Sequence, residues 1–468
     1  MAKTFFRNEI TKSMMIALLG VVTILCGLLI NSKNRFYIGA MIILVAFVLY
    51  FVSVYSIAKR NWLDVRAVFT GVWLSTLGLA ALRLNDYQEQ WKRNTWILLS
   101  LAYMVYQIGA TIGIMNGERL FANLKKVSSK IQSKRISYEM QENRLFPICI
   151  IITLIGVVCF GINVAIKGYI PAFSSSTTAY VDFYTKFHLF AVASTAVSGL
   201  CYYCIKTQPL SMIKRVILWA CIFYLVVLFP TLVISRGVFI VAALSLSTTI
   251  FYLNKQKLYV FVLCLIAMAG VYLFTSNLRG YSDEYLDTYF EPSDIEIETP
   301  DGEGGVQFSL PPKLSFLYGY FTVSHDNFNE AVQHLEGYTW GARQFYPFNV
   351  ILNIQSISDM RADGEWYQVR PHLNTVNMIG VFYYDFHELG IVICTLLWAL
   401  VFGLMQSFYM KSKGPFSLFI LGYAMNPVAL CFFASWVDTF ELWMFWGTIL
   451  IMGVMASLKV RPKKSCLE

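Results

Sequence analysis

Long apolar runs joined by short polar links make up most of the chain from Met14 to Leu458. A membrane-spanning helix needs about 20 consecutive, mostly apolar residues, and about twelve runs of that length occur here. Because no water satisfies backbone polar groups inside a bilayer, helices are the expected form of these runs. The sequence therefore predicts an all-α, polytopic membrane helix bundle of about twelve transmembrane helices. The predicted spans are residues 14–30, 37–57, 67–84, 95–114, 147–165, 187–205, 216–234, 237–253, 258–275, 389–409, 415–433 and 443–459.

One long polar segment, residues 276–374, interrupts this pattern. It carries 15 acidic and five basic residues in a chain whose net charge is +9. If the N-terminus lies in the cytoplasm, 24 of the 37 Lys and Arg residues fall in inner segments. Cytoplasmic loops of membrane proteins carry an excess of Lys and Arg, so both termini are predicted to be cytoplasmic. The acidic segment then lies on the outer face, and the basic balance reports topology instead of nucleic-acid binding.

The span pattern divides the chain into three consecutive regions. Residues 1–275 form a membrane bundle of about nine spans, which includes a basic cytoplasmic loop at 115–146. Residues 276–388 form the extracytoplasmic loop and helix, and residues 389–468 form the C-terminal spans and a cytoplasmic tail. This basic segment is expected to form a cytoplasmic helix that lies against anionic lipid. A docking site for a partner protein is the alternative for the same residues.

Two parts of the outer segment are expected to be helical. Between Leu314 and Leu335, apolar residues recur at helical spacing, and Ser324 is a candidate N-cap. Aromatic residues flank this stretch, which is typical of a helix lying at the membrane surface. The mixed stretch Arg370–Glu388 leads directly into the span at 389 and is interpreted as an outward extension of that helix.

The predicted outer side carries a set of six arginines: Arg83, Arg236, Arg279, Arg343, Arg361 and Arg370. Arg361 lies in a polar loop and is interpreted as solvated, which leaves the other five as candidates. Arg236 lies between two spans with almost no loop, where a charge is costly unless it meets an anion or lines a wet cavity. The alternative for each is an arginine whose side chain reaches the lipid headgroups. Guanidinium groups bind phosphate oxygens in pairs and stay charged at any working pH. We therefore expect these residues to bind a pyrophosphate group.

Candidate acid–base residues gather at the outer end of a span. The stretch Tyr383–Gly390 contains Asp385, His387 and Glu388, and His372 lies shortly before it. Asp, Glu or His can take a proton from an attacking sugar hydroxyl. The structural alternative is an ordinary polar helix end in an aromatic belt.

Cysteine and histidine spacing predicts no metal site, and no cofactor is expected. Cys201 and Cys204 have the CxxC spacing of redox proteins, but both fall inside a predicted span and are interpreted as packing residues. The segment 276–374 contains no cysteine, so no disulfide is predicted there.

The chain resembles the Wzy-type oligosaccharide repeat-unit polymerases, the O-antigen and capsular polysaccharide polymerases of bacteria. The resemblance covers most of the length and is carried by the number of spans, the large late outer loop and the outward arginines. Locally it is carried by Ile234–Gly237, which opens a span, and by Arg370–Gly380, which leads into Asp385–Gly390.

This resemblance implies a metal-independent glycosyltransferase in the bacterial plasma membrane. Its substrate would be an undecaprenyl-pyrophosphate-linked oligosaccharide, with membrane lipids and chain-length regulator or flippase proteins as further partners. The arginines would hold the pyrophosphate, and Asp385, His387, Glu388 or His372 would take the hydroxyl proton. Two alternatives stay open, an O-antigen-ligase-like transferase and a flippase or transporter of lipid-linked sugars. The absence of repeated halves and the long outer segment disfavour a transporter.

Overall fold

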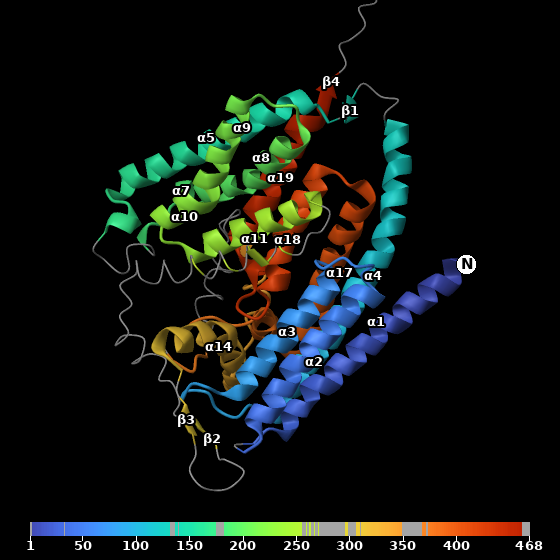
Figure 1. Cartoon of the computed structure of the whole chain (residues 1–468), viewed down its shortest axis with the longest axis vertical. Coiled ribbons are helices and arrows are strands. Elements are labelled where there is room, and N and C mark those ends of the chain that lie inside the picture. Colours follow the sequence, from blue (N-terminus) through green and yellow to red (C-terminus); the bar gives the residue numbers. More distant parts are fainter. Residues whose placement is uncertain are drawn as a thin grey trace, which may run out of the picture. The chain divides into compact units, whose positions relative to one another are not determined.

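The fold is described from a computed structural model of the chain (Figure 1). The described residues are 2–31, 33–131, 136–138, 140–174, 182–254, 259, 262–263, 266, 270, 295–297, 306–308, 310–348, 367–370 and 373–460.

Helices dominate the described residues. The α-helices are α1 (Ala2–Leu25), α2 (Arg35–Ser56), α3 (Val65–Leu82), α4 (Arg93–Ile131), α5 (Glu142–Lys167), α7 (Lys186–Ser194), α8 (Ser198–Thr207), α9 (Met212–Phe223), α10 (Phe229–Leu232), α11 (Arg236–Leu253), α14 (Pro312–His334), α17 (Met378–Ser412), α18 (Pro415–Ala429) and α19 (Phe440–Ser457). Short 3-10 turns are η1 (Cys26–Leu29), η2 (Pro171–Phe173), η3 (Thr195–Val197) and η5 (Trp436–Asp438), and η4 (Tyr224–Leu228) is a π-helical turn between α9 and α10.

Ten helical segments in the described part of the chain are long and apolar enough to cross a membrane. Each coincides with one predicted span, which confirms a multi-pass helical bundle. The predicted span 415–433 corresponds to α18, which has only 15 residues and rises roughly 22 Å, less than the hydrocarbon thickness of about 30 Å. The predicted span 258–275 lies largely outside the described residues.

Four strands of three residues each accompany the helices in the part of the chain that the structure describes. β1 (Ile136–Tyr138) pairs antiparallel with β4 (Leu458–Val460), and β2 (Ile295–Ile297) pairs antiparallel with β3 (Val306–Phe308). Two-stranded pairs of this length are too small to build a core of their own. The helices therefore carry the fold.

The chain forms two compact units. Unit 1 contains Met1–Gly113, Tyr281–Gly403 and Asn426–Phe440, and unit 2 contains Ile114–Gly280, Leu404–Met425 and Glu441–Glu468. The three consecutive regions expected from the sequence are thus distributed over both units. Unit 1 includes Arg83, Arg343, Arg370 and the stretch around Asp385, whereas Arg236 belongs to unit 2.

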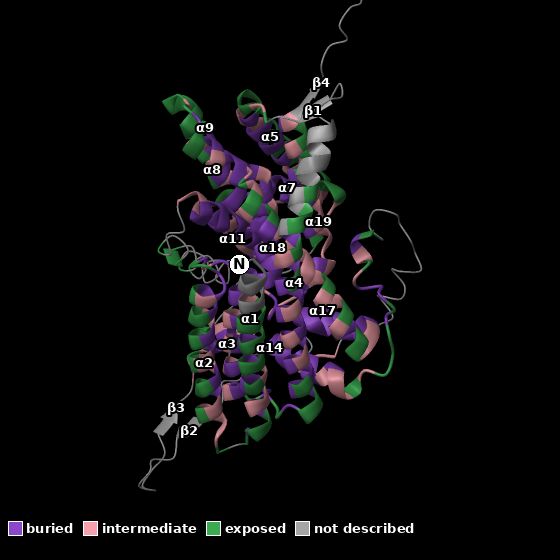
Figure 2. Cartoon of the chain, turned by 90° about the vertical axis from the view of Figure 1, so that its right-hand side faces the viewer, coloured by how far each residue is buried: buried purple, intermediate pink, exposed green. Residues whose placement is uncertain are grey.

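In unit 1, α2 and α3 pack side by side through two glycines (Figure 1). A Cβ atom added at Gly39 would lie 2.9 Å from the carbonyl oxygen of Gly78, and the reverse distance is also 2.9 Å. Small residues allow membrane helices to approach this closely. Buried residues make up 72% of the α3 span but 33% of the α2 span (Figure 2). α3 is therefore an inner helix of the unit, and α2 presents the apolar surface expected toward lipid.

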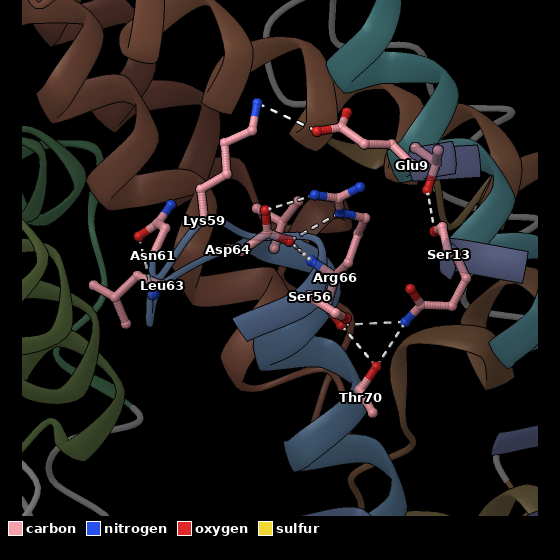
Figure 3. Close-up of polar contacts among 12 residues, drawn as sticks. Glu9, Ser13, Ser56, Lys59, Asn61, Leu63, Asp64, Arg66 and Thr70 are labelled. Carbon is pink, nitrogen blue, oxygen red and sulfur yellow. Dashed lines mark hydrogen bonds and ion pairs between the residues drawn. The ribbon is translucent and has the colours of Figure 1, made fainter. Parts of the chain in front are cut away.

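A buried ion pair fixes the beginning of α3 (Figure 3). Asp64 is the N-cap, and its Oδ1 accepts a hydrogen bond from the backbone N–H of Arg66 at 3.0 Å. The Arg66 guanidinium donates from Nε to Oδ1 at 3.0 Å and from Nη2 to Oδ2 at 2.9 Å. Thr70 and Gln107 both donate to the carbonyl oxygen of Arg66. The bidentate geometry satisfies a carboxylate and a guanidinium that are both buried.

α14 confirms the helix predicted over 314–335, but its polar side chains are buried. The predicted cap at Ser324 is wrong, because the helix begins at Pro312 and Ser324 lies in its middle. There the Ser324 hydroxyl donates to the carbonyl oxygen of Phe433 at 2.8 Å. Five consecutive or nearly consecutive polar residues of α14 are at most 2% exposed: Ser324, His325, Asp326, Asn327 and Asn329.

Two asparagines of α14 fix loops of unit 1. Asn327 accepts a hydrogen bond from the N–H of Val369 at 2.9 Å and donates to the carbonyl oxygen of Thr375 at 2.7 Å. Asn329 accepts from the N–H of Lys92 at 3.0 Å and from the hydroxyl of Thr95 at 2.8 Å. α14 therefore positions the loop before α4 and the segment that leads into α17.

Unit 2 is built around close contacts of α5 with α7 and of α8 with α9 and α11. A Cβ atom at Gly156 of α5 would lie 2.6 Å from Cβ of Ser194, so only glycine permits this approach. Residues 115–131 of the expected cytoplasmic loop are helical, because α4 continues without interruption to Ile131. The helix expected in this basic segment is therefore confirmed for residues 115–131, and its position against lipid stays a prediction.

Candidate functional site

A turn of unit 1, residues 339–344, is held in place by Asp385 of α17. The carboxylate Oδ1 accepts hydrogen bonds from the Thr339 hydroxyl at 2.5 Å and from the N–H of Arg343 at 3.2 Å. Oδ2 accepts from the N–H of Gln344 at 3.0 Å. Asp385 is fully buried, and a buried carboxylate needs such donors. Its oxygens therefore organise the turn.

The backbone of this turn is unusual at two consecutive residues. Trp340 and Gly341 have φ values of 51° and 84°. Glycine adopts positive φ readily, whereas a bulky residue there is a steric outlier. The bonds to Asp385 offset the cost at Trp340 and keep the turn in one conformation.

The turn places Arg343 against α17. The guanidinium carbon lies 4.5 Å from the ring centroid of Tyr384, a cation–π contact, and the residue is fully buried. The Tyr384 hydroxyl accepts a hydrogen bond from the N–H of Tyr367 at 2.9 Å. A permanent cation is thus held inside unit 1 beside the residue that precedes Asp385.

α17 is broken one residue after Asp385. Phe386 has φ −149° and ψ 21°, and His387 has φ 49° and ψ −136°, so neither residue is helical. A Cβ atom at Gly390 would lie 2.0 Å from the carbonyl oxygen of Phe382, so the break requires glycine there. The His387 Nε2 lies 3.2 Å from the carbonyl oxygen of Gly337 and donates to it, which places the ring proton on Nε2.

Aromatic rings surround His387. Its ring centroid lies 4.2 Å from that of Tyr338 and 4.8 Å from that of Tyr383. Glu388 follows directly and is exposed. The break therefore separates a buried carboxylate, Asp385, from an accessible one, Glu388.

The other two predicted arginines of unit 1 are half-buried. Arg370 ends the stretch 367–370, which Tyr384 and Asn327 hold by hydrogen bonds to its backbone. Arg83 follows α3 in a left-handed conformation with φ 49° and ψ 67°. Burial and then the charge of Arg35 lower the pKa of Arg83, and it stays cationic because arginine begins from a very high pKa.

Arg236 opens α11 in unit 2 and is 6% exposed. The preceding Ile234 has φ 50°, which a β-branched residue rarely adopts. The N–H of Ser235 donates to the carbonyl oxygen of Pro230 at 2.9 Å, and its hydroxyl accepts from the N–H of Val238 at 3.3 Å. The tight connection expected around Arg236 is present, and it buries the arginine.

The structure thus places Asp385, His387 and Glu388 at the break in α17, with Arg343 on the turn that Asp385 holds. Arg83 and Arg370 belong to the same unit, and Arg236 belongs to the other. Arg279 and His372 lie outside the described residues.

Asp326 is a buried acid that sequence reasoning did not single out. It accepts hydrogen bonds from Gln88 Nε2 at 2.9 Å and from Trp91 Nε1 at 2.8 Å. Burial raises the pKa of Asp326 to about 7, although both bonds lower it. The only sequence signal is a Ser-His-Asp-Asn run inside a helix that was expected to bury only its apolar face.

His325 beside it is held as a neutral imidazole. The Asn377 amide donates to Nδ1 at 3.0 Å, so the proton lies on Nε2, which donates to the Thr76 hydroxyl at 3.1 Å. Burial lowers the pKa of His325 to about 3. These partners assign His325 a role in packing α14 against α3 and the start of α17.

Comparison with known proteins gives no relative for this chain: no family model, no curated protein and no solved structure matches it.

Proposed function

We propose that the protein is a membrane polymerase that joins lipid-linked oligosaccharide repeat units by glycosyl transfer. The observation that carries this proposal is Arg343, a fully buried guanidinium on a turn that Asp385 organises. A buried cation in an apolar chain is costly and is retained chiefly where it meets an anion or a wet cavity. A pyrophosphate that links a glycan to undecaprenol fits the paired donors of a guanidinium.

In the proposed reaction, a hydroxyl oxygen of the acceptor repeat unit attacks the anomeric carbon of the donor glycan. The bond from that carbon to the pyrophosphate oxygen breaks, and undecaprenyl pyrophosphate leaves. The hydroxyl proton passes to a base of the enzyme. The cationic groups stabilise the charge that develops on the leaving group. The acceptor and the donor both reside at the outer face of the bacterial plasma membrane.

The base is assigned to Glu388, with His387 as the second candidate. Glu388 is exposed, and it follows the break in α17. Asp385 is a weaker candidate because three donors already occupy its oxygens. His372, predicted for the same role, stays a prediction.

Binding of the leaving pyrophosphate is assigned to Arg343, with Arg83 and Arg370 of the same unit as further cations. Arg236 and Arg279 stay predicted pyrophosphate ligands. The tight, buried connection at Arg236 supports a role beyond a headgroup contact, because such a contact requires no burial.

A test uses the purified protein in lipid nanodiscs with a lipid-linked repeat unit, followed by sizing of the products. Arg343→Ala is expected to abolish chains longer than the substrate, and Arg343→Lys to retain part of the activity because it keeps the charge. Glu388→Gln is expected to lower kcat by about 10²–10⁴-fold. Arg215→Ala is the matched control, since Arg215 is an exposed arginine at the start of α9.

Wild-type product lengths from Arg343→Ala would refute the assignment. The alternatives give different results in cells that lack the gene. Loss of a polymerase leaves single repeat units at the surface, whereas loss of a flippase leaves none. A ligase-like transferase would transfer one glycan to a different acceptor and would build no longer chains in the nanodisc assay.

A further inference from the structure

Two exposed aromatic rings lie in the chain just before Arg343 and have no part in the reaction described above. Tyr338 is 46% exposed and Trp340 is 67% exposed. Their ring centroids are 5.1 Å apart, with the planes inclined at 41°. Together they form an aromatic surface, the 338/340 ring pair, at the edge of the turn that carries Arg343.

Hydrogen bonds of Thr339 and a ring contact with His387 hold the 338/340 ring pair in place. Thr339, between the two aromatic residues, donates its N–H to the carbonyl oxygen of Tyr384 at 3.0 Å and its hydroxyl to Asp385. The ring centroid of Tyr338 lies 4.2 Å from that of His387, with the two planes inclined at 32°. Trp340 is kept in the left-handed region at φ 51°. Backbone strain therefore persists at Trp340 in the turn and at His387 in the break of α17, and the rings of Tyr338 and Trp340 stay exposed.

We propose that the 338/340 ring pair binds a pyranose ring of the lipid-linked oligosaccharide, as a sugar subsite next to Arg343. This inference rests on the proposed function, because it places the sugar beside the expected pyrophosphate. The flat C–H face of a pyranose packs on an aromatic face, and its hydroxyl groups need polar partners at the edge. His387 lies beside Tyr338, and the exposed carboxylate of Glu388 follows it in the chain.

The arrangement favours a sugar over the membrane interface as the occupant. Aromatic residues of an interface belt occur at ordinary helix ends and need no strained backbone. Strain that persists in a folded protein is concentrated at ligand sites. The turn 339–344 carries both Trp340, which is exposed, and Arg343, which is buried. A sugar at the ring pair would therefore lie on the same short segment as the proposed pyrophosphate ligand.

The test measures sugar binding without polymerisation. Saturation-transfer difference NMR is recorded on the protein in nanodiscs with methyl glycosides of glucose, galactose and N-acetylglucosamine as probes. The wild type is expected to give signals from the ring protons of at least one probe. Tyr338→Ala and Trp340→Gly are expected to lose them, with at least a tenfold fall in apparent affinity. Trp219→Ala is the control, because Trp219 is a half-exposed tryptophan of α9.

The thermal midpoint of Trp340→Gly separates lost binding from lost folding. Glycine adopts φ 51° without steric cost, so this variant is expected to unfold at the wild-type temperature or above it. Absence of signals for every probe, or equal signals from Trp340→Gly and the wild type, would overturn the subsite. Stronger fluorescence quenching by brominated lipid in the wild type than in Trp340→Phe, without sugar signals, would assign the rings to the membrane interface. Sugar binding that persists in a protein without polymerase activity would instead refute the proposed function alone.

Discussion

Replacing Asp385 by alanine tests whether this residue holds the 339–344 turn. The substitution removes the acceptor of two backbone N–H groups, those of Arg343 and Gln344. The Thr339 hydroxyl keeps a second acceptor, the carbonyl oxygen of Tyr384 at 3.2 Å. A buried donor without a partner costs about 1–3 kcal/mol, so two of them lower the free energy of unfolding by about 2–6 kcal/mol. Asp385→Asn keeps one acceptor oxygen, and about half of that loss is expected.

Chemical unfolding in detergent micelles measures both variants against Asp182→Ala. Asp182 is exposed, and its replacement is expected to change stability by no more than about 0.5 kcal/mol. The reasoning would be refuted if Asp385→Ala were as stable as that control.

Kinetics of Asp385→Asn then separate positioning from proton transfer. A positioning role predicts a higher KM for the pyrophosphate-linked donor, with the pH dependence of kcat retained, because Arg343 is displaced and the base is unchanged. A general base at this residue predicts the reverse, a large fall in kcat and the loss of one limb of the pH profile. A purely kinetic defect with wild-type stability would assign the proton transfer to Asp385.

Asp64→Ala leaves the Arg66 guanidinium buried without its carboxylate and is expected to cost about 3–5 kcal/mol of stability. Replacing both residues by apolar ones of similar size is expected to cost less. A double-mutant cycle in unfolding experiments checks this, and additive losses from the two single substitutions would contradict it. Because the pKa of Asp326 is raised to about 7, the native state keeps a proton that the unfolded state releases near pH 4, so stability falls as pH rises between these values. The free energy of unfolding then changes by at most about 1.4 kcal/mol per pH unit. Asp326→Asn is expected to remove this pH dependence, and an unchanged dependence in that variant would exclude Asp326 as its source. Gly390→Ala places a Cβ atom 2.0 Å from a backbone oxygen and is expected to destabilise the protein by about 1–3 kcal/mol. In the control Gly447→Ala the added Cβ meets open space, so this variant is expected to be neutral or stabilising. Equal thermal midpoints of the two variants would contradict the prediction.

The positions of the membrane helices could be predicted from the sequence, because bilayer thickness sets the length of an apolar run that spans it. α3 extends from Val65 to Leu82 where residues 67–84 were predicted, and charged residues, Asp64 and Arg83, flank both ends. No knowledge of neighbouring helices is needed for such an assignment. The apolar run at 415–433 was overestimated, because the apolar pattern continues beyond the end of α18 at Ala429.

The interior of unit 1 was not accessible in this way. An amphipathic pattern predicted the extent of α14 but also predicted exposed polar residues. Asp326 and Asn329 are buried because Gln88, Trp91 and Thr95, more than 200 positions earlier in the chain, supply their partners. A polar residue in a helix is therefore either exposed to solvent or hydrogen-bonded to a residue far away in the chain. The sequence of that helix alone does not distinguish the two.

The same reasoning applies to the two carboxylates near the break in α17. Asp385 and Glu388 are three residues apart, and on an unbroken helix they would share one face. The helix is not continuous: Phe386 and His387 leave the helical region, and the 339–344 turn then takes the oxygens of Asp385. Glu388 is exposed as a result. The sequence indicated that acid–base residues gather here, but the packing of a segment about 40 residues away assigns one carboxylate to the structure and leaves the other accessible for chemistry.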